Sequence, residues 1–444
     1  MRLRDHRQSP HLRSGGLAGL MMVLATIFES PKPFRFDAGA YWSSAVDLSS
    51  GIDPFGQEGF QLRGAWTAIL YLPAAVVTRV FGASNAGFAV IVENSLMIAF
   101  IGVVLVPSLV SVWRPVTPIT IYASAAVTWL LLGRFAPYPL TDVGAAALLL
   151  AAVVLLAHGT RRSLGAAGLL AGVGFNIRPA YLLTTVTIAV AVLCYQRRRT
   201  GIWFAGGSAL ALLPQVLTNL SHGDGWRPWP AGTGSLTMLQ SAYASFVVRY
   251  DTLAYVPTNK PQLFFCDPRI ARAVGDDAPR GPGELAAFYA HHPAGAVLLV
   301  VEKIGASLHW PESVPYYARA GLGDALFAFL VTAVTVAGAI SLARQGWRDR
   351  PPTLPQVGVA AVWVGSLLTI ATTAPETRFA VPLVIFGVVG CVAGLGRSGT
   401  PGVPRWSSLV AGTVAVAAVF AAGQLGLHHP APQGHVTPAI CARS

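Results

Sequence analysis

The stretch "AGFAVIVENSLMIAFIGVVLVPSLVSV", residues 86–112, is one apolar run with a single ionisable side chain, Glu93. A helix needs about 20 apolar residues to cross a hydrocarbon core of about 30 Å, so this run predicts a membrane span. The rest of the chain has the same character, because 53% of its 444 residues are hydrophobic and only 11% are charged. A soluble fold with this composition would expose large apolar patches. The sequence therefore predicts an all-α polytopic membrane protein.

Other apolar runs of helical length lie on both sides of this one. Together they give eleven predicted spans, near residues 15–29, 86–112, 116–133, 142–158, 163–175, 180–195, 201–219, 321–343, 356–373, 379–395 and 407–427. Two more runs, 65–82 and 293–310, contain a proline or ionisable residues within the run. We expect these two to lie on the outer surface as juxtamembrane and amphipathic helices.

The basic residues predict the orientation, because short cytoplasmic loops collect Arg and Lys. The predicted inside segments are the N-terminal arm with Arg2, Arg4, Arg7 and Arg13, then Arg114, Arg161 with Arg162, 197–199, 344–350, and Arg397 with Arg405. They hold 15 basic and 2 acidic residues, whereas the outside holds 16 of each. The net charge of +12 thus indicates membrane topology and not a nucleic-acid partner.

This topology puts the N-terminus in the cytoplasm and the C-terminus outside. Only three of the 31 basic residues are lysine, a bias typical of a high-GC bacterial genome, so we expect a multi-pass protein of a bacterial plasma membrane. Residues 1–220 would form a seven-span catalytic module that includes the external loop 30–85. Residues 221–320 would form a long external loop with an amphipathic helix, and residues 321–444 four spans and an external tail.

The first external loop begins with "FRFDAGAYW", residues 34–42. The pattern predicts a short helix with Asp37 at its start, followed by Tyr41 and Trp42 and closed by Gly51. Asp37 could simply cap a juxtamembrane helix whose aromatic pair lies at the membrane interface. It could also be a functional carboxylate on the outer face.

Several motifs favour the functional interpretation when they are taken in order. They are "FRFDAGAYW", "SSGIDPF", "RVFGASNAGFAVIVENSLM", "YPLTDVGAAALLLAAVVLLAHGTRR", "AGLLAGVGFNIRPAYLL", "YAHHPAGAVLLVVEKIGASLHW" and "APETRFAVPLVIF". Their order and their side of the membrane resemble the C-type (GT-C) membrane glycosyltransferases. This superfamily includes protein O-mannosyltransferases, lipid A aminoarabinose transferases and actinobacterial envelope mannosyl- and arabinosyltransferases. The resemblance covers most of residues 15–395.

The resemblance implies transfer of a sugar, such as mannose or arabinose, from a polyprenyl phosphate to an envelope glycan, lipid or protein on the outer face. A phosphate is a competent leaving group, so one base suffices, and Asp37 would be that base in an inverting displacement. Asp142 would orient the acceptor or the base, or would only cap its helix. Tyr41, Trp42 and Glu376 would contact the sugar or the acceptor.

The departing phosphate needs fixed cations, and arginine offers it a planar fork of donors. Arg378 and Arg178 are the first candidates, with Lys303 and His292 as further contacts from the loop helix. Each has a structural alternative. Arg378 could be a snorkelling interfacial residue paired with Glu376, Arg178 could form a buried pair with a carboxylate, and the loop helix could be a surface anchor.

A polytopic transporter or lipid-linked sugar flippase is the alternative function. Ion-coupled transporters commonly have repeated halves and buried ionisable residues near the bilayer midplane. Here only Glu93 lies well inside a predicted span, and the sequence has no visible repeat. It also has no metal-ligand cluster and no phosphate-binding glycine loop, so we expect neither a metal nor another cofactor besides the lipid-linked donor.

The four cysteines divide between the two sides of the predicted membrane. Cys194 and Cys391 fall near cytoplasmic span ends, whereas Cys266 and Cys441 both fall outside, where thiols can oxidise. We therefore predict a disulfide between Cys266 and Cys441 that ties the C-terminal tail to the long external loop. The alternative is two free thiols, one of them near a frayed terminus.

Overall fold

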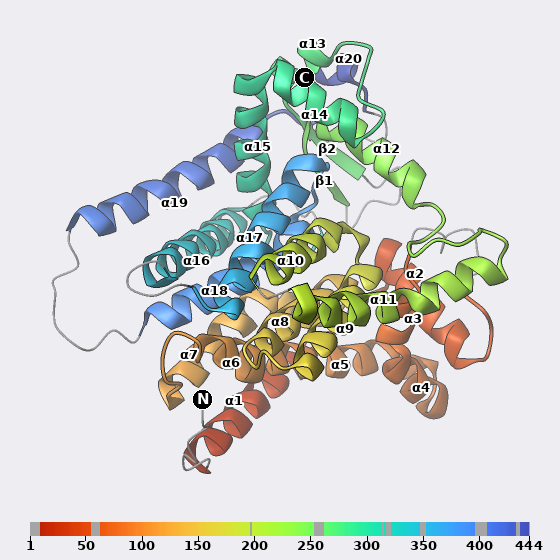
Figure 1. Cartoon of the computed structure of the whole chain (residues 1–444), viewed down its shortest axis with the longest axis vertical. Helices are drawn as coiled ribbons and strands as arrows, with labels where there is room; N and C mark the ends of the chain where they lie inside the picture. The colour runs from red at the N-terminus through yellow and green to blue at the C-terminus, as the bar shows by residue number, and fades with distance from the viewer. Residues whose placement is uncertain are drawn as a thin grey trace.

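The computed structural model describes residues 9–54, 63–195, 198–252, 262–312, 315–316, 321–346, 352–395, 406–431 and 436–443. Several of the predicted cytoplasmic basic residues lie outside the described residues, namely Arg2, Arg4, Arg7, Arg197, Arg348, Arg350, Arg397 and Arg405. Helix makes up 76% of the structure, which confirms a largely α-helical protein. Figure 1 shows a body of long helices below a lobe of short elements that carries the C-terminus at the top.

The described elements of the N-terminal half are all helices. Its elements are α1 (Ser9–Ile27), α2 (Phe36–Ser49), α3 (Trp66–Leu70), α4 (Leu72–Phe81), α5 (Ala86–Phe100), a π-helical turn (Ile101–Leu105), α6 (Val106–Val110), α7 (Pro118–Leu132), α8 (Thr141–Leu156), α9 (Arg161–Ile177), α10 (Leu182–Tyr195) and α11 (Arg198–Ser221).

The C-terminal half adds a two-stranded antiparallel hairpin, which the all-α prediction did not contain. Its elements are α12 (Thr233–Ala244), β1 (Val247–Thr252), β2 (Gln262–Cys266), α13 (Pro268–Val274), α14 (Pro282–His291), α15 (Pro293–Leu308), α16 (Leu322–Gly346), α17 (Leu354–Thr372), a 3₁₀ turn (Thr377–Ala380), α18 (Val381–Gly394), α19 (Trp406–Gly426) and α20 (Pro438–Cys441).

The described residues contain six helices that are long and apolar enough to cross a membrane, or seven if the bent pair α14 and α15 counts as one span. These helices support a multi-pass membrane protein but number fewer than the eleven predicted spans. All eleven runs are helical. However, α1, α8, α9, α10 and α19 do not meet the length and hydropathy of the six. A 16-residue helix such as α8 rises only about 24 Å, less than the hydrocarbon core.

Helices α9 and α11 are packed backbone to backbone through glycines. A Cβ atom at Gly168 would lie 1.9 Å from the carbonyl oxygen of Phe204, and one at Gly207 would lie 2.0 Å from that of Gly165. Such close approach through small residues is typical of helix pairs in membranes. It holds in place the end of α9, from which Arg178 projects.

Two helix boundaries predicted from the sequence are confirmed. α2 ends at Ser49, and Gly51 has φ +76°, a conformation that favours glycine. α9 ends at Ile177, a 3₁₀ turn occupies Pro179–Tyr181, and α10 begins at Leu182. Proline at 179 cannot donate a backbone hydrogen bond, which explains the break. Arg178 is therefore placed at the interruption between two helices, as the sequence predicts.

The upper lobe in Figure 1 is built from the segment that the sequence predicted as the long external loop and from the C-terminal tail. β1 pairs with β2, and the tail extends along β2, where Cys266 N donates to His429 O at 3.0 Å and Ala431 N donates to Phe264 O at 2.8 Å. A disulfide joins Cys266 to Cys441 across a Cα–Cα distance of 5.5 Å. The predicted pairing is confirmed, and Cys194 and Cys391 are free.

We expect the double variant Cys266→Ser, Cys441→Ser to lose about 2–4 kcal/mol of stability in the lobe, because the bond closes a sequence separation of 175 residues. Thermal unfolding of the detergent-purified protein, with and without a reductant, measures this loss. The double variant Cys194→Ser, Cys391→Ser is the control and should unfold like the wild type. Equal unfolding of both double variants would contradict a stabilising bridge.

Candidate active site

Asp37 lies at the centre of a cluster of charged side chains. It occupies the first turn of α2, but the N-cap residue is Arg35 and no side chain caps the helix. Its Oδ1 accepts a hydrogen bond from Arg63 Nη2 at 2.7 Å, and its Oδ2 accepts one from Arg378 Nη2 at 3.1 Å. The side chain of Asp37 keeps 29% of its surface exposed. Asp37 therefore acts as a partly accessible ion-pair partner and not as a helix cap.

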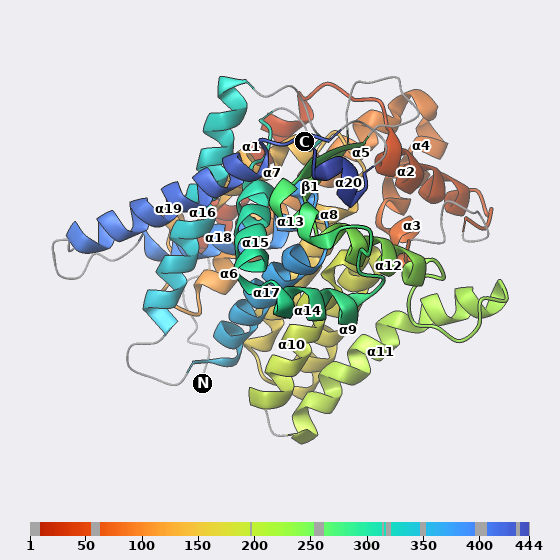
Figure 2. The ribbon, with the colours of Figure 1, turned by 90° about the horizontal axis from the view of Figure 1, so that it is seen from above.

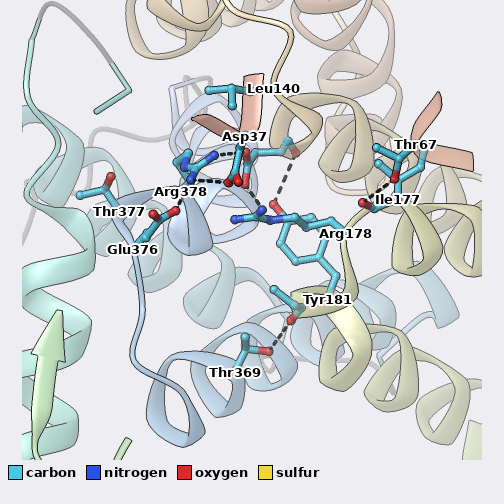
Figure 3. Close-up of polar contacts among 12 residues, drawn as sticks. Asp37, Thr67, Leu140, Ile177, Arg178, Tyr181, Thr369, Glu376, Thr377 and Arg378 are labelled. Atoms are coloured by element: carbon cyan, nitrogen blue, oxygen red, sulfur yellow. Dashed lines mark hydrogen bonds and ion pairs between the residues drawn. The ribbon is translucent and has the colours of Figure 1, made fainter. Parts of the chain in front are cut away.

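Arg378 connects all three acids of the cluster. Its Nη2 also pairs with the Glu376 carboxylate, and its Nη1 lies 3.6 Å from Asp142 Oδ2. Arg378 is only 2% exposed, so a snorkelling interfacial arginine does not describe it, although the expected pair with Glu376 is present. Glu376 is held in turn by Thr252, whose hydroxyl donates to its Oε1 at 3.1 Å. Figure 3 shows Asp37, Glu376 and Arg378 converging.

Asp142 and Arg178 form the buried floor of the cluster. The Asp142 side chain is fully buried, and its Oδ1 lies 3.0 Å from Arg178 Nε. The N-cap of α8 is Leu140 without a side-chain cap, so Asp142 does not cap its helix. The guanidinium of Arg178 lies 5.2 Å from the centre of the Phe379 ring. The expected structural alternative for Arg178, a pair with a buried carboxylate, is thus realised inside the candidate site (Figure 3).

Sequence reasoning missed two residues of the cluster, Arg63 and Tyr316. Arg63 binds Asp37 and lies 5.2 Å from the centre of the Tyr41 ring. Tyr316 is 5% exposed, and its ring lies 5.6 Å from the Arg378 guanidinium. Neither belongs to one of the motifs quoted above. Both lie outside helices and strands, and long-range contacts bring them to the cluster.

Polar atoms that are buried and lack a hydrogen-bond partner gather around this cluster. They are Asp142 Oδ1 and Oδ2, Arg178 Nε, Arg378 Nη1, Arg63 Nε, Thr141 Oγ1 and Tyr316 OH. Some of them approach an opposite charge, but without hydrogen-bond geometry. About 90% or more of buried polar groups in proteins are hydrogen-bonded. Their concentration at one place therefore marks a site where a polar ligand or water would complete their bonding.

The backbone next to Asp37 adopts an uncommon conformation. Phe36 has φ +53°, in the left-handed region that bulky side chains rarely occupy. Its ring packs edge-on against Tyr316 with centroids 6.3 Å apart, and Tyr316 packs in the same way against Tyr138 at 5.4 Å. Such backbone strain concentrates at functional sites, where the surrounding packing maintains it. Here the conformation of Phe36 sets the direction of the chain at the first turn of α2, where Asp37 lies.

The charges of the cluster determine the ionisation of Asp37. Burial alone would raise the pKa of Asp37, but the charges of Arg378 and Arg63 outweigh burial and hold that pKa well below its ordinary value. Asp37 is therefore a carboxylate at neutral pH. Burial, with further repulsion from Asp37, raises the pKa of Glu376 despite its pair with Arg378. The two acids are thus held in different electrostatic environments.

The two aromatic candidates of α2 differ in their placement. Tyr41 is 1% exposed and lies beneath Arg63, so it supports the cluster from inside. Trp42 packs against Phe34 with ring centroids 5.3 Å apart. It joins a separate apolar group with Ala45 and Tyr71 on the side of α2 that faces α4. Tyr41 thus lies at the site, whereas Trp42 packs on the neighbouring helices.

The loop-helix candidates Lys303 and His292 are placed elsewhere. Lys303 Nζ is fully buried and donates to the carbonyl oxygens of Ala244, Thr373 and Ala371 at 2.7, 2.8 and 3.3 Å. These carbonyls end α12 and α17, so the ammonium group interacts favourably with two helix C-termini. His292 is exposed at the 116° bend between α14 and α15. Within the described chain neither residue contacts Asp37 or its arginines.

We expect Lys303→Met to reduce stability by about 1–3 kcal/mol, because it leaves buried carbonyl oxygens without donors. It should not change how the rate depends on donor concentration. Thermal unfolding and initial rates measure the two effects separately. His292→Gln, an exposed change on the same loop, is the control and should alter neither. An increase in the donor KM of Lys303→Met at full stability would return Lys303 to the list of phosphate ligands.

The candidate site thus unites Asp37, Arg63, Asp142, Arg178, Tyr316, Glu376 and Arg378 from six separate segments. Three carboxylates face three arginines. In the part of the chain that the structure describes, no group of three or more His, Cys, Asp or Glu could hold a metal ion. No protein-family model, curated protein or solved structure matches the chain.

Proposed function

We propose that the chain is an integral membrane glycosyltransferase of the C-type. It transfers a sugar from a polyprenyl phosphate to an acceptor hydroxyl on the external face, with inversion at the anomeric carbon. Asp37 is the base, and Arg378, Arg178 and Arg63 hold the donor phosphate. The sugar is mannose or arabinose, and the acceptor is an envelope glycan, lipid or protein. The orientation predicted from the basic loops, with a cytoplasmic N-terminus, is part of this proposal.

One observation carries the proposal: a partly exposed carboxylate lies within hydrogen-bond distance of two arginines at a place where buried polar atoms are unsatisfied. A phosphate bound there would accept hydrogen bonds from arginines whose side-chain polar contacts within the described chain are with carboxylates. Arginine forks match the developing charge on phosphate oxygens as the glycosidic bond breaks. The disulfide supports the membrane orientation, because it requires the tail and the long loop on one oxidising side.

The chemical step needs one proton acceptor. The acceptor oxygen attacks the anomeric carbon, the bond from that carbon to the phosphate oxygen breaks, and Asp37 takes the hydroxyl proton. The leaving group departs as a polyprenyl phosphate whose charge the arginines stabilise. A carboxylate with a lowered pKa is a weak base. Donor phosphate drawn to Arg378 and Arg63 would weaken their hold on Asp37, raise its pKa and so activate it only when the donor is bound.

Asp142 and Glu376 have supporting roles in this proposal. Both are buried against Arg378, one on Nη1 and the other on Nη2. The two acids fix the plane of the Arg378 guanidinium, because contacts at both terminal nitrogens oppose its rotation. Asp142 also holds Arg178. The acids thus orient the phosphate-binding arginines, and Asp37 is the one acid of the three with substantial exposure.

Membranes that contain the overproduced protein, supplied with radiolabelled polyprenyl-phosphate mannose or arabinose, test the proposal. We expect label in a product with a new glycosidic bond. The flippase alternative gives another result, in which the lipid-linked sugar moves between the leaflets of reconstituted vesicles and stays attached to its phosphate. Movement without any transfer to an acceptor would contradict the enzyme proposal.

Tyr316→Phe should lower transfer about two- to tenfold, because its hydroxyl has no protein partner and is free to contact the substrate. Stability should not fall, since the change removes an unsatisfied buried group. Initial rates and thermal unfolding check both statements. Tyr122→Phe, at an exposed position of α7, is the control. A loss of stability without a loss of transfer would place the Tyr316 hydroxyl outside the substrate site.

A further inference from the structure

A cavity of about 240 Å³ is lined by Arg249 and Asp251 of β1. It is bounded by β1, the end of α15, the start of α16 and the end of α19, with Arg249, Asp251, His309, Asp324 and Gln424 among its lining residues. Figure 1 shows α19 running toward α15, and Figure 2 shows these two helices and β1 from above. Its volume is below the roughly 300–1,000 Å³ of pockets that take drug-sized ligands. The cavity therefore fits a ligand of about one sugar unit.

The inner wall of the cavity is a rigid ion pair. Arg249 donates from Nε and Nη2 to Asp251 Oδ2 at 3.0 and 2.6 Å. Its Nη1 donates to the carbonyl oxygens of Ala306 and His309 at the end of α15. Both charged residues are nearly buried, at 3% and 4% exposure. The bonds leave Asp251 Oδ1 without a hydrogen-bond partner among the described residues, so one acceptor is available to a ligand.

The opposite wall offers neutral polar groups. His309 Nε2 bonds to Phe420 O at 3.1 Å, and its Nδ1 lies 3.3 Å from Gln424 Nε2. Burial, with the charge of Arg249, lowers the pKa of His309 to about 4, so the imidazole is neutral at physiological pH. Nε2 then donates to the carbonyl oxygen and Nδ1 accepts from Gln424. The carboxamide oxygen of Gln424 remains available as an acceptor.

The charges of the lining exclude other ligand classes. Arg249 is balanced by Asp251, and Asp324 adds a further acid, so the cavity has no net positive charge that would attract a phosphate. The described residues contain no cluster that could hold a metal ion. An amine would have to compete with Arg249 for Asp251. A neutral polyol needs only hydrogen-bonding groups and an apolar wall, which Phe265 and Leu427 provide.

The cavity is adjacent to the candidate active site but separate from it. Thr252 follows Asp251 on β1 and donates to Glu376 at 3.1 Å. Trp310, which lines the cavity, donates from Nε1 to Thr377 O at 3.0 Å. A single strand and one indole ring thus separate the two sites. A ligand in the cavity would lie beside the reacting groups without touching them.

We propose that this cavity binds a neutral sugar unit of the acceptor, one that does not itself react. This proposal rests on the proposed function, because it assumes an acceptor with more than one sugar. Binding energy from a remote unit can position the reacting hydroxyl at Asp37. The cavity would therefore select acceptors that already carry a glycan.

Saturation-transfer NMR on the detergent-purified full chain tests the proposal. The probes are methyl α-D-mannopyranoside and methyl α-D-arabinofuranoside, with methyl phosphate and choline as charged comparisons. Ala325→Trp fills the cavity from α16, and Leu326→Trp adds the same side chain at an exposed neighbouring position. We expect millimolar sugar binding that Ala325→Trp weakens at least tenfold and Leu326→Trp preserves. Methyl phosphate binding should be the same in all three proteins.

Three outcomes would overturn the proposal. They are no sugar signal at roughly 10 mM, equal sugar signals in both tryptophan variants, or loss of methyl phosphate or choline binding in Ala325→Trp in place of sugar binding. If Ala325→Trp does not fold, Gln424→Leu at an exposed position of the lining provides the test. It removes the carboxamide and should also weaken sugar binding.

The binding readout separates this proposal from the proposed function. Binding is measured again in the Asp37→Asn background, where transfer is not needed. Sugar binding that depends on the cavity, together with no transfer by the wild-type protein, would support the sugar site and contradict the proposed enzyme activity. Transfer by the wild-type protein without such binding would support the proposed enzyme activity and contradict the sugar site.

Discussion

Asp37→Asn is expected to reduce sugar transfer by a factor of roughly 10² to 10⁴, the usual contribution of a positioned general base. Asparagine preserves the shape of the side chain but cannot take the proton of the acceptor hydroxyl. The fold should persist, because Arg378 keeps its contacts with Glu376 and Asp142. Initial rates of transfer from a labelled polyprenyl-phosphate sugar measure the effect, and thermal unfolding checks the fold.

Asp47→Asn is the matched control for this prediction. Asp47 lies on the same helix as Asp37, about three turns further along, and is not among the residues of the cluster. It should transfer at the wild-type rate. Near-wild-type transfer by Asp37→Asn, with the donor supply controlled, would contradict the assignment of Asp37 as the base. Asp37 would then be only a structural ion-pair partner.

Replacement of Arg378 should affect both stability and donor use. Arg378→Ala removes a cation that contacts all three acids, and loss of a buried partner typically costs about 3–5 kcal/mol. Arg378→Lys keeps a charge, but a single ammonium group cannot bind Asp142 on one side and Glu376 with Asp37 on the other. We expect the lysine variant to fold and to lose about 1.5–3 kcal/mol of donor interaction, roughly a tenfold to hundredfold effect.

Initial rates over a range of donor concentrations distinguish these effects, with thermal unfolding measured in parallel. Arg269→Lys is the control, because Arg269 also bridges two acids, Asp267 and Glu302, but at 56% side-chain exposure in the upper lobe. It should leave donor dependence unchanged. The assignment of Arg378 to the phosphate fails if Arg378→Lys folds and uses the donor like the wild type.

The sequence predicted much of the site because several of its residues open or end helices. Asp37, Asp142, Arg178 and Arg378 all lie at such boundaries, which hydropathy and proline positions reveal along the chain. Arg63 and Tyr316 lie outside the helices, so no periodicity marks them. A lysine on a loop helix has the same sequence pattern whether it binds a phosphate or stabilises the protein. Lys303 bonds to carbonyl oxygens at the ends of α12 and α17, and only the packing of these helices against α15 shows that its role is structural.

The span count was less predictable than the helices. Hydropathy locates apolar runs, and all eleven are helical. It does not distinguish a helix that faces lipid from one that is buried in protein. Asp142 shows the difference, because it stands at the start of a predicted span and is fully buried against two arginines. Several helices are consequently shorter than a full span.

By itself the sequence determined the membrane class and the helix boundaries around Asp37, because composition and proline positions can be read along the chain. It also predicted the pairing of Cys266 with Cys441, but free thiols remained the alternative until the structure showed the bridge. Only the tertiary structure decided which charges meet. Asp37 and Arg378 are 341 residues apart in the chain, yet their side chains lie 3.1 Å apart. The physical reason is that a buried charge needs a partner, and the packing of the helices decides which partner is near. That packing depends on long-range contacts, such as those of Gly168 and Gly207, which no local sequence pattern specifies.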